Sequence, residues 1–302
     1  MTLPSDFVKL IDSYIARGGV QLRGLCEALS ATAPQVSVRF NPLKPRPRGA
    51  FEASAAVAWW PDAAYLDARP AFTFDPALHQ GRYYVQDASS MAIAAVVRRL
   101  VASMPADAAI TYLDACAAPG GKTAYIAERL EGTGRVYAWD LHAHRVDLIR
   151  ATMRRLHLDN VRVAARDAMQ VRDEFLGSMD AVLLDAPCSG LGVMDDKPDV
   201  KYRHTPESVA ELCDTQRKLL DACCQYVRVG GTLVYSTCSM LKDENERQIA
   251  RFLKDHPEFE IDALPDTVPS ALRAHYGENG LQLLPCRDGV EGFFVARMKR
   301  RA

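Results

Sequence analysis

The chain has 302 residues, a length that favours one large catalytic domain with a smaller domain attached. It carries 37 Lys and Arg residues against 38 Asp and Glu residues, so its formal net charge of -1 gives no overall attraction to nucleic acid or anionic lipid. A hydrophobic content of 48% and a charged content of 25%, without repeats or low-complexity segments, exclude the disordered, collagen-like and membrane classes.

The first 80 residues are expected to form a small α+β domain. Its predicted elements are helices over residues 5–17 and 21–29 and a strand over residues 36–40. A proline-containing connector over residues 72–80 follows. We therefore predict two domains, residues 1–80 and residues 81–302.

A basic stretch lies within this first domain. Between Glu27 and Glu52 the sequence has no acidic residue. The basic side chains in that interval are Arg39, Lys44, Arg46 and Arg48. Their local charge of +4 contrasts with the near neutrality of the whole chain. Two interpretations remain open here, a solvated loop and a site that contacts the phosphates of a nucleic acid.

After a helix predicted over residues 88–101, strands and helices are predicted to alternate. The strands cover residues 110–114, 135–139, 161–165, 181–184, 232–235 and 292–297. The helices cover residues 120–130, 142–156, 206–227 and 243–254. This alternation indicates an α/β fold, with a mostly parallel, doubly wound sheet that carries helices on both faces. Ligands of such sheets bind at the carboxyl ends of the strands, so the loops there form the candidate site.

No segment has the pattern of a membrane span or a signal peptide. Asp6, Lys9 and Asp12 interrupt the apolar residues of the N-terminus, and no other stretch approaches the roughly 18 apolar residues that a span requires. We therefore expect a cytoplasmic protein without a membrane partner.

The eight cysteines are expected to be free thiols. They include no C-x-x-C pair, and a cytoplasmic compartment keeps thiols reduced. The seven histidines include no H-E-x-x-H motif, which argues against a zinc hydrolase. No metal site is expected.

The first candidate loop, Asp114 to Thr123, leads from a strand through glycines into a helix, as a loop that binds a cofactor would. A Walker A loop would need Gly where Cys116 stands, and the G-x-G-x-x-G motif of dinucleotide folds is absent. S-adenosylmethionine is the third possibility. Asp140, at the end of the second strand, could accept from its ribose diol, and Asp167, after the third strand, from its adenine amine.

Two cysteines follow the fourth and fifth predicted strands. Cys188 and Cys238 lie in loops flanked by polar or glycine residues, where burial as a small hydrophobe is a poor explanation. A thiolate at either position could act as a nucleophile. The cysteines best explained by packing are Cys26, Cys213, Cys223, Cys224 and Cys286.

Several motifs together resemble those of RNA (cytosine-5)-methyltransferases of the Sun/Fmu/NSUN family. The three that carry chemistry are Cys116 to Lys122 (CAAPGGK), Asp185 to Gly190 (DAPCSG) and Ser236 to Ser239 (STCS). Three more extend the likeness over nearly the whole chain: Ser37 to Pro42 (SVRFNP), Tyr84 to Met91 (YVQDASSM) and Asp288 to Phe294 (DGVEGFF). The QDASSM form is most similar to the RsmF-like branch, which modifies small-subunit ribosomal RNA.

The resemblance implies a Rossmann-like class I methyltransferase domain, with an antiparallel last strand, beside an N-terminal RNA-binding domain. It implies that Cys238 adds to carbon 6 of cytosine, that Asp185 stabilises the charged ring near nitrogen 3, and that Cys188 assists proton removal from carbon 5 and product release. The residues implied to bind S-adenosylmethionine are Cys116, Ala117, Ala118, Pro119, Gly120, Gly121, Lys122, Asp140, Arg145, Asp167 and Asp185. The residues implied to contact RNA are Arg39, Lys44, Arg46 and Arg48.

The favoured function is thus methylation of RNA, most simply ribosomal RNA, with transfer RNA as an alternative. A DNA cytosine-5 enzyme also has its nucleophile in a Pro-Cys loop like Pro187-Cys188, but such an enzyme does not need the thiol of Cys238, so no DNA partner is expected. An inactive RNA-binding assembly factor would have no need for both thiols. A nicotinamide-dependent oxidoreductase fits least. The chain ends soon after Phe294, and we expect it to lack the additional C-terminal RNA-binding region of many RsmF-like members.

Overall fold

The structure is a computed structural model. It describes residues 25, 36–47, 55–93, 96, 109–130, 133–194, 197, 199–264, 266 and 268–302. The helices predicted over residues 5–17 and 21–29 therefore lie outside the described residues, except for Leu25, which is helical. Arg48 also lies outside them.

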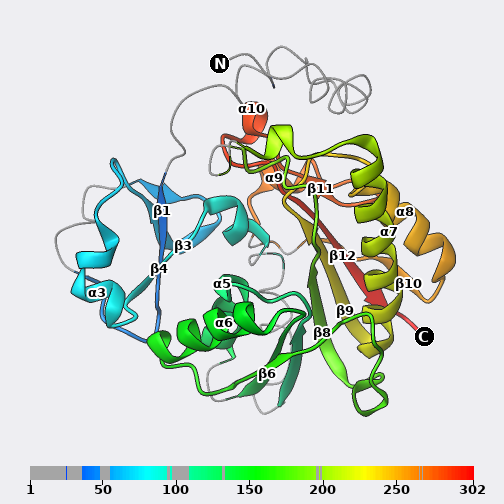
Figure 1. The fold of residues 1–302 in the computed structure, drawn as a ribbon, viewed down its shortest axis with the longest axis horizontal. Helices are drawn as coiled ribbons and strands as arrows, with labels where there is room; N and C mark the ends of the chain where they lie inside the picture. Colours follow the sequence, from blue (N-terminus) through cyan, green and yellow to red (C-terminus); the bar gives the residue numbers. More distant parts are fainter. Residues whose placement is uncertain are drawn as a thin grey trace.

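A small antiparallel sheet forms the N-terminal part of the described chain (Figure 1). Its strands, in the spatial order β2-β3-β1-β4, are β2 (Ala56–Val57), β3 (Trp60–Tyr65), β1 (Ser37–Phe40) and β4 (Tyr83–Val85). The short helices η1 (Phe72–Phe74) and α3 (Pro76–His79) connect β3 to β4. The strand predicted over residues 36–40 is confirmed as β1. Because β4 pairs with β1, this sheet includes residues beyond the boundary predicted at residue 80.

The larger sheet has eight strands and is parallel along most of its width. The strands on its main path, in spatial order, are β10 (Phe259–Ile261), β12 (Phe294–Arg300), β9 (Val227–Thr237), β8 (Met179–Asp185), β5 (Ile110–Asp114), β6 (Gly134–Asp140) and β7 (Val161–Ala165). The run from β9 to β7 is parallel, whereas β12 is antiparallel to both of its neighbours. The short strand β11 (Leu281–Gln282) pairs with β12.

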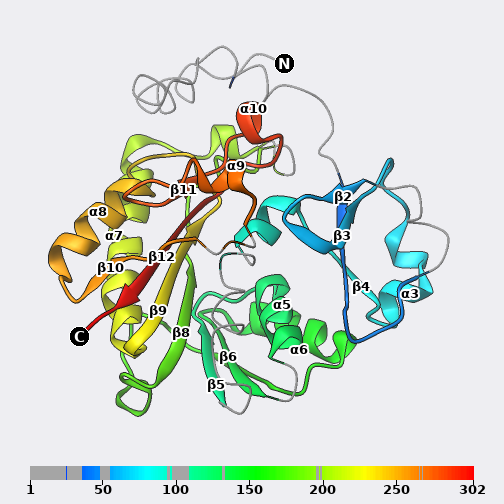
Figure 2. The ribbon, with the colours of Figure 1, turned by 180° about the vertical axis from the view of Figure 1, so that it is seen from behind.

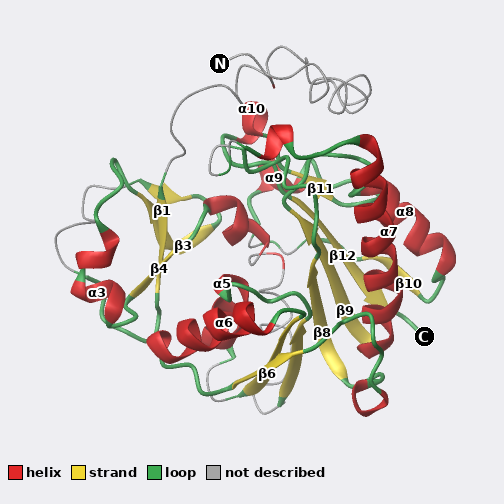
Figure 3. Cartoon of the chain, viewed as in Figure 1, coloured by secondary structure: helices red, strands yellow, loops and turns green. Residues whose placement is uncertain are grey.

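Helices cover both faces of this sheet (Figures 2 and 3). On one face, α5 (Gly121–Arg129) and α6 (Ala143–Leu156) pack in a core with alternate residues of the strands, such as Tyr112. On the other face, α7 (Pro206–Cys223) and α8 (Glu246–Asp255) pack in a second core that contains the intervening residues, such as Leu113. The alternation of side chains along each strand thus supplies both cores, and the predicted doubly wound α/β fold is confirmed.

Several boundaries differ from the prediction. Strand β9 begins at Val227, five residues before the predicted start at residue 232. The prediction missed these residues because Gly230 and Gly231 break the apolar pattern. In the structure both glycines lie within β9, at a shift in its register with β8. Helix α7 ends at Cys223 and is followed by the 3-10 turn η4 (Cys224–Tyr226). Helix α8 begins at Glu246, three residues later than predicted, because Asp243 to Asn245 form a turn.

The small sheet packs directly on helix α5. Trp60 of β3 makes an edge-to-face contact with Tyr125 of α5, with 4.4 Å between the ring centroids. Trp59 Nε1 donates a hydrogen bond of 2.8 Å to the Ala88 carbonyl. Both tryptophans belong to the same core as the inner face of α5. The small sheet and the larger sheet therefore share a core. Over the described residues, no helix combines the length and apolar character needed to cross a bilayer.

Candidate active site

The predicted site residues meet at one edge of the large sheet. Asp114, Asp140 and Asp185 end the parallel strands β5, β6 and β8, and Cys238 directly follows β9. Because carboxyl ends of parallel strands share an edge, these side chains lie in a row. A cavity of about 480 Å³ has among its lining residues Asp140, Asp167, Asp185, Cys188 and Cys238. Its volume lies within the range of small-molecule sites.

The glycine loop between β5 and α5 forms one wall of this cavity. Gly120 is the N-cap of α5 with φ of 104°, a left-handed conformation that favours glycine. The Ala118 N–H donates to the Asp140 carboxylate at 3.3 Å, and the Ala117 N–H donates to the Trp139 carbonyl at 2.8 Å. The loop is therefore tied to the end of β6.

Asp140 is buried, with 3% of its surface exposed, and backbone donors hold its carboxylate. Besides Ala118, the His142 N–H donates to it at 3.1 Å. Arg145 bridges the carboxylate at 3.4 Å and the Ala118 carbonyl at 3.3 Å. Asp167 accepts from the Met169 N–H at 2.9 Å and lines the same cavity. The structure thus brings these two aspartates and Arg145 together with the glycine loop.

Lys122, in the first turn of α5, faces Asp185 across the cavity. Its Nζ lies 2.8 Å from Asp185 Oδ2, while Ser236 Oγ donates 2.7 Å to Asp185 Oδ1. Burial is the largest single effect and lowers the pKa of Lys122, but the charge and hydrogen bond of Asp185, with the charges of Cys238 and Asp114, together raise it above its ordinary value. Nζ also lies 5.4 Å from the centroid of the Phe293 ring. Lys122 is therefore a cation that Asp185 holds in place in the lining of the cavity.

The two predicted cysteines lie side by side, with 3.2 Å between the Sγ atoms of Cys188 and Cys238. The hydrogen bond from the Cys188 thiol lowers the pKa of Cys238 below its ordinary value, against the opposing effect of burial. Lys122 and Lys197 lower this pKa further. The same hydrogen bond, together with burial, raises the pKa of Cys188 well above the ordinary value. Both shifts favour a proton on Cys188 and a hydrogen bond from its thiol to Cys238, so Cys238 loses its proton more readily than Cys188 does.

Asp114 lies deeper, at the end of β5. Its Oδ2 accepts 2.6 Å from Thr123 Oγ1, and Oδ1 is buried without a partner among the described residues. Burial raises the pKa of Asp114 to about 7, although the hydrogen bond from Thr123 acts in the opposite direction. A second cavity of about 310 Å³ touches Asp114 and the β4 segment Tyr84 to Asp87, and it shares Lys122 and Asp185 with the first.

The loop before β12 closes the side of the cavity next to the cysteines. It supplies Glu291 and Phe293 to the lining. The Gly292 N–H donates to the Gly192 carbonyl at 2.8 Å, and the Gly192 N–H donates to the Cys238 carbonyl at 3.0 Å. A Cβ on Gly192 would lie 1.8 Å from the Gly292 carbonyl oxygen, so only glycine allows this approach.

The prediction that Arg39 contacts RNA is wrong. Its side chain is 1% exposed and forms a buried ion pair with Glu128 of α5, while its Nε donates 2.9 Å to Gln86 Oε1. Lys44 is half-buried and donates to the Gln80 carbonyl at 2.5 Å. The side chain of Arg46 is 59% exposed and pairs with Asp62 at 3.0 Å. For Lys44 and Arg46, contact with RNA stays a prediction.

Two side chains at the cysteines were not predicted from the sequence. Lys197 lines both cavities and its charge acts on Cys238. Glu244 is completely buried behind the two cysteine loops. It lies in the polar run Lys242 to Glu246, which is typical of a solvated helix start, so no sequence signal distinguishes its burial.

Comparisons with known proteins agree with this geometry. Residues 102–299 match the family described as 16S rRNA methyltransferase RsmB/F, and residues 3–88 match the N-terminal domain of 16S rRNA methyltransferase RsmF. A probable ribosomal RNA small subunit methyltransferase B from Bacillus subtilis is 40% identical over 73% of this chain and 48% of that protein. Ribosomal RNA small subunit methyltransferase F from Escherichia coli O1:K1 is 35% identical over 87% of this chain and 57% of that protein.

The crystal structure of PH0851 superposes with a TM-score of 0.86 at 27% identity, over 99% of this chain and 66% of that one. The chain thus spans between about half and two thirds of the lengths of the relatives named above. The family match covers most of the sequence, including the three motifs that carry chemistry, and it confirms the resemblance stated from them. This chain belongs to the RsmB/F family of 16S rRNA methyltransferases.

Proposed function

We propose that this protein transfers a methyl group from S-adenosylmethionine to carbon 5 of a cytosine in small-subunit ribosomal RNA. The observation that carries the proposal is the single cavity that Asp140, Asp167 and Asp185 share with the thiols of Cys188 and Cys238. A cofactor pocket and a nucleophile are the two parts that this reaction needs. A ribosomal substrate also accords with the cytoplasmic location expected from the sequence.

The residues along β5, β6 and β7 fit the cofactor. When bound, S-adenosylmethionine supplies an electrophilic methyl group on its sulfonium. The buried Asp140 carboxylate, fixed by backbone N–H groups, is suited to accept from a ribose diol. Asp167, at the next strand end, is suited to accept from the adenine amine. The glycine loop allows a close approach of the backbone at the N-terminus of α5.

Cys238 is the proposed nucleophile. Carbon 5 of cytosine is a weak nucleophile, and addition of a thiolate to carbon 6 converts the ring into an enamine that can attack a methyl donor. The hydrogen bond from Cys188 and the nearby Lys122 stabilise this thiolate. Asp185, held by Lys122 and Ser236, faces the same space and is the proposed partner of the ring near nitrogen 3.

Cys188 is the proposed base for the second half of the reaction. In the free protein, its hydrogen bond to Cys238 and burial keep it protonated. Once Cys238 has formed a bond to carbon 6, the charge that holds this proton is gone, so Cys188 becomes easier to deprotonate. It first releases its own proton to water in the cavity that it lines. The resulting thiolate can then take the proton from carbon 5, and the bond between Cys238 and carbon 6 breaks, which returns its electron pair to the sulfur and restores the aromatic ring.

The test is methyl transfer from labelled S-adenosylmethionine to ribosomal RNA, transfer RNA and DNA. We expect label in ribosomal RNA with the wild type and none with Cys238→Ala. Cys188→Ala should accumulate a covalent protein–RNA adduct, visible as a slow band on a denaturing gel. Cys286→Ala, which changes an exposed cysteine outside the lining of this cavity, is the matched control and should behave as wild type.

Two results would contradict the proposal. Undiminished labelling by Cys238→Ala would remove the nucleophile assignment. Label that appeared in transfer RNA or DNA but not in ribosomal RNA would keep the chemistry and replace the substrate.

A further inference from the structure

Glu244 lies between the two loops that carry the cysteines and contacts both. It is in the turn before α8, and none of its surface is exposed. Its carboxylate accepts from the Ser189 N–H at 2.8 Å and from Ser189 Oγ at 2.5 Å. It also accepts from Ser239 Oγ and, at 3.0 Å, from Gln216 Nε2. Among the described residues no Lys, Arg or His forms an ion pair with it.

The two serines adjoin the two reactive thiols. Ser189 follows Cys188 in the chain, and Ser239 follows Cys238. Their hydroxyl oxygens lie 3.1 Å apart, and the two sulfur atoms of the neighbouring cysteines lie 3.2 Å apart. One carboxylate therefore bonds the residue next to each sulfur, and it fixes the spacing of the β8 and β9 loops at this point.

Glu244 is also held through its own carbonyl and through the side chain of the next residue, Asn245. Tyr235 Oη donates 2.6 Å to the Glu244 carbonyl. Asn245 accepts from Thr237 Oγ1 at 2.5 Å and donates to the Ser239 carbonyl at 2.9 Å. The turn before α8 is thus bound to the end of β9, on either side of Cys238.

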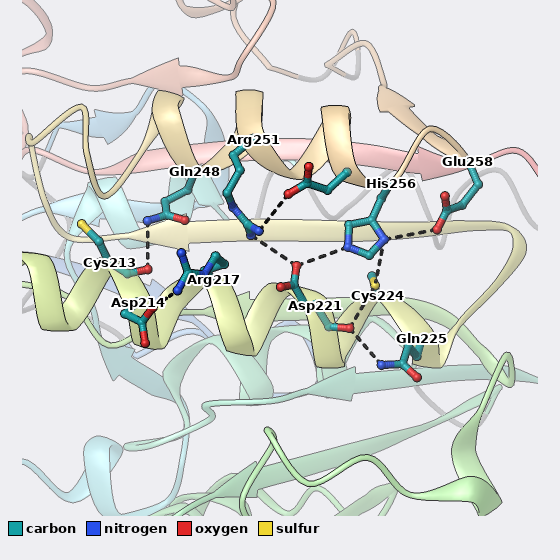
Figure 4. A network of polar contacts seen from close by, with 11 residues as sticks. Cys213, Asp214, Arg217, Asp221, Cys224, Gln225, Gln248, Arg251, His256 and Glu258 are labelled. Atoms are coloured by element: carbon teal, nitrogen blue, oxygen red, sulfur yellow. Dashed lines mark hydrogen bonds and ion pairs between the residues drawn. The ribbon is translucent and has the colours of Figure 1, made fainter.

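A polar network joins α7, which carries Gln216, to α8, which follows Glu244 (Figure 4). Arg251 of α8 contacts Asp221 of α7 at 3.2 Å, and Gln248 Nε2 donates 3.0 Å to the Cys213 carbonyl. His256, just after α8, lies 3.2 Å from the same Asp221. Gln216 lies on α7 between Cys213 and Asp221. This network therefore fixes the position of Gln216, which donates a hydrogen bond to Glu244 from α7.

The charge of Glu244 acts unequally on the two cysteines. It adds to the effects of Cys238 and burial that raise the pKa of Cys188. On the other side of the pair, the cations Lys122 and Lys197 lower the pKa of Cys238, opposed by Asp185. An acid behind one sulfur and cations beside the other favour a proton on Cys188 and a negative charge on Cys238.

We propose that Glu244 is a positioning residue that sets the distance between the two thiols and directs the hydrogen bond from Cys188 to Cys238. Glu244 thereby determines which cysteine is the thiolate. Its significance for catalysis rests on the proposed function, but the state of the thiols can be measured without RNA or cofactor.

The test compares the pH dependence of alkylation by iodoacetamide at each cysteine, measured by peptide mass spectrometry on the folded full chain. In the wild type, we expect Cys238 to react at a lower pH than Cys188. In Glu244→Ala, the Cys238 profile should move up by about one pH unit, which lowers its rate near neutral pH about tenfold. The charge of Glu244 acts on Cys188, so the shift of the Cys238 profile comes from the lost loop spacing and from the weaker hydrogen bond from Cys188.

Glu244→Gln is the conservative variant. Its amide oxygen can accept from the Ser189 N–H and Gln216, and its amide nitrogen can donate to the serine hydroxyls. The spacing is retained, so the Cys238 profile should stay within about 0.3 pH unit of the wild type, a twofold change in rate. Asp243→Asn is the matched control, because Asp243 is the exposed acid next in sequence and pairs with Arg247 at the surface. It should leave both profiles unchanged.

The proposal is overturned if folded Glu244→Ala keeps the wild-type profile of Cys238, or if Glu244→Gln fails as completely as alanine. Should Glu244→Ala not fold, the double variant Ser189→Ala/Ser239→Ala removes the hydroxyl links and keeps the carboxylate with its bonds to backbone and Gln216. It should shift the Cys238 profile in the same direction, and an unchanged profile would overturn the proposal. A wild type that methylates no RNA would refute the proposed function and leave these thiol measurements intact.

Discussion

The buried ion pair between Arg39 and Glu128 should be a main support of the junction between the small sheet and α5. Both side chains are 1% exposed, and Arg39 Nε also donates 2.9 Å to Gln86 Oε1. The guanidinium lies 5.9 Å and 5.7 Å from the ring centroids of Tyr84 and Tyr125. Arg39→Met would remove this cation and leave the carboxylate buried without its partner.

We expect Arg39→Met to lower the free energy of unfolding by about 3–5 kcal/mol, the usual effect of breaking one partner of a buried pair. With a urea m-value of about 3 kcal/mol/M for a chain of this size, the midpoint should fall by about 1–1.7 M. The double variant Arg39→Met/Glu128→Leu removes both charges and should recover most of the loss, because apolar pairs of similar volume replace buried ion pairs at little cost.

The assay is urea denaturation followed by tryptophan fluorescence, since Trp59 and Trp60 lie at this junction. Arg46→Met is the control: it removes an arginine from the same N-terminal region whose side chain is 59% exposed and whose ion pair with Asp62 is at the surface. Its effect should stay below about 1 kcal/mol. A midpoint for Arg39→Met within 0.3 M of the wild type, or a double variant as unstable as the single one, would refute this reasoning.

Three further predictions concern the site. Gly192→Ala would place a Cβ 1.8 Å from the Gly292 carbonyl oxygen and shift the Cys238 loop. Methyl transfer should therefore fall about 100-fold, while the affinity for the cofactor, measured by calorimetry, stays unchanged. An equal loss of methyl transfer and cofactor affinity would contradict this prediction. Burial raises the pKa of Asp114 to about 7, so the stability that its protonation contributes is present below about pH 4 and is lost as the pH rises through 7. Asp114→Asn should therefore gain stability relative to wild type between pH 4 and 8, by up to about 4 kcal/mol in urea denaturation. A stability difference between the two proteins that does not change with pH would contradict this prediction. Asp140→Asn should weaken binding of S-adenosylmethionine about 10- to 100-fold, and a change below about twofold would remove its proposed role.

Six strands of the large sheet, β5 to β9 and β12, could be predicted because their apolar runs are bounded by polar or glycine turns, whereas the short strands β10 and β11 were not predicted. In the small sheet only β1 was predicted. Strand β3 contains Pro61 and two alanines, a composition that argues against a strand, yet its residues 63–65 pair with β1 and its Trp60 pairs with β2. Tertiary packing of Trp60 against α5 outweighs that local preference.

Most of the site could be predicted from the strand ends, because a residue that ends a parallel strand lies at the shared carboxyl edge of the sheet. Asp140, Asp185 and Cys238 were placed at this edge of the sheet in this way. Arg39 and Glu244 were not, because burial depends on partners that are remote in sequence. Glu128 is 89 residues from Arg39, and Ser189 is 55 residues from Glu244. Charge alone places such side chains in solvent, and only the fold shows the bonds that offset their burial.

The position of β12 bears on how the chain folds during synthesis. This strand lies between β9 and β10, although it follows both of them in the sequence. Until it emerges from the ribosome, β9 is an edge strand whose N–H and C=O groups along Leu233 to Thr237 are open to any other strand. The loop that delivers Phe293 to the cavity is also still missing its anchor. Termination of synthesis before β12 should therefore yield a product that aggregates through β9, rather than a partly active enzyme.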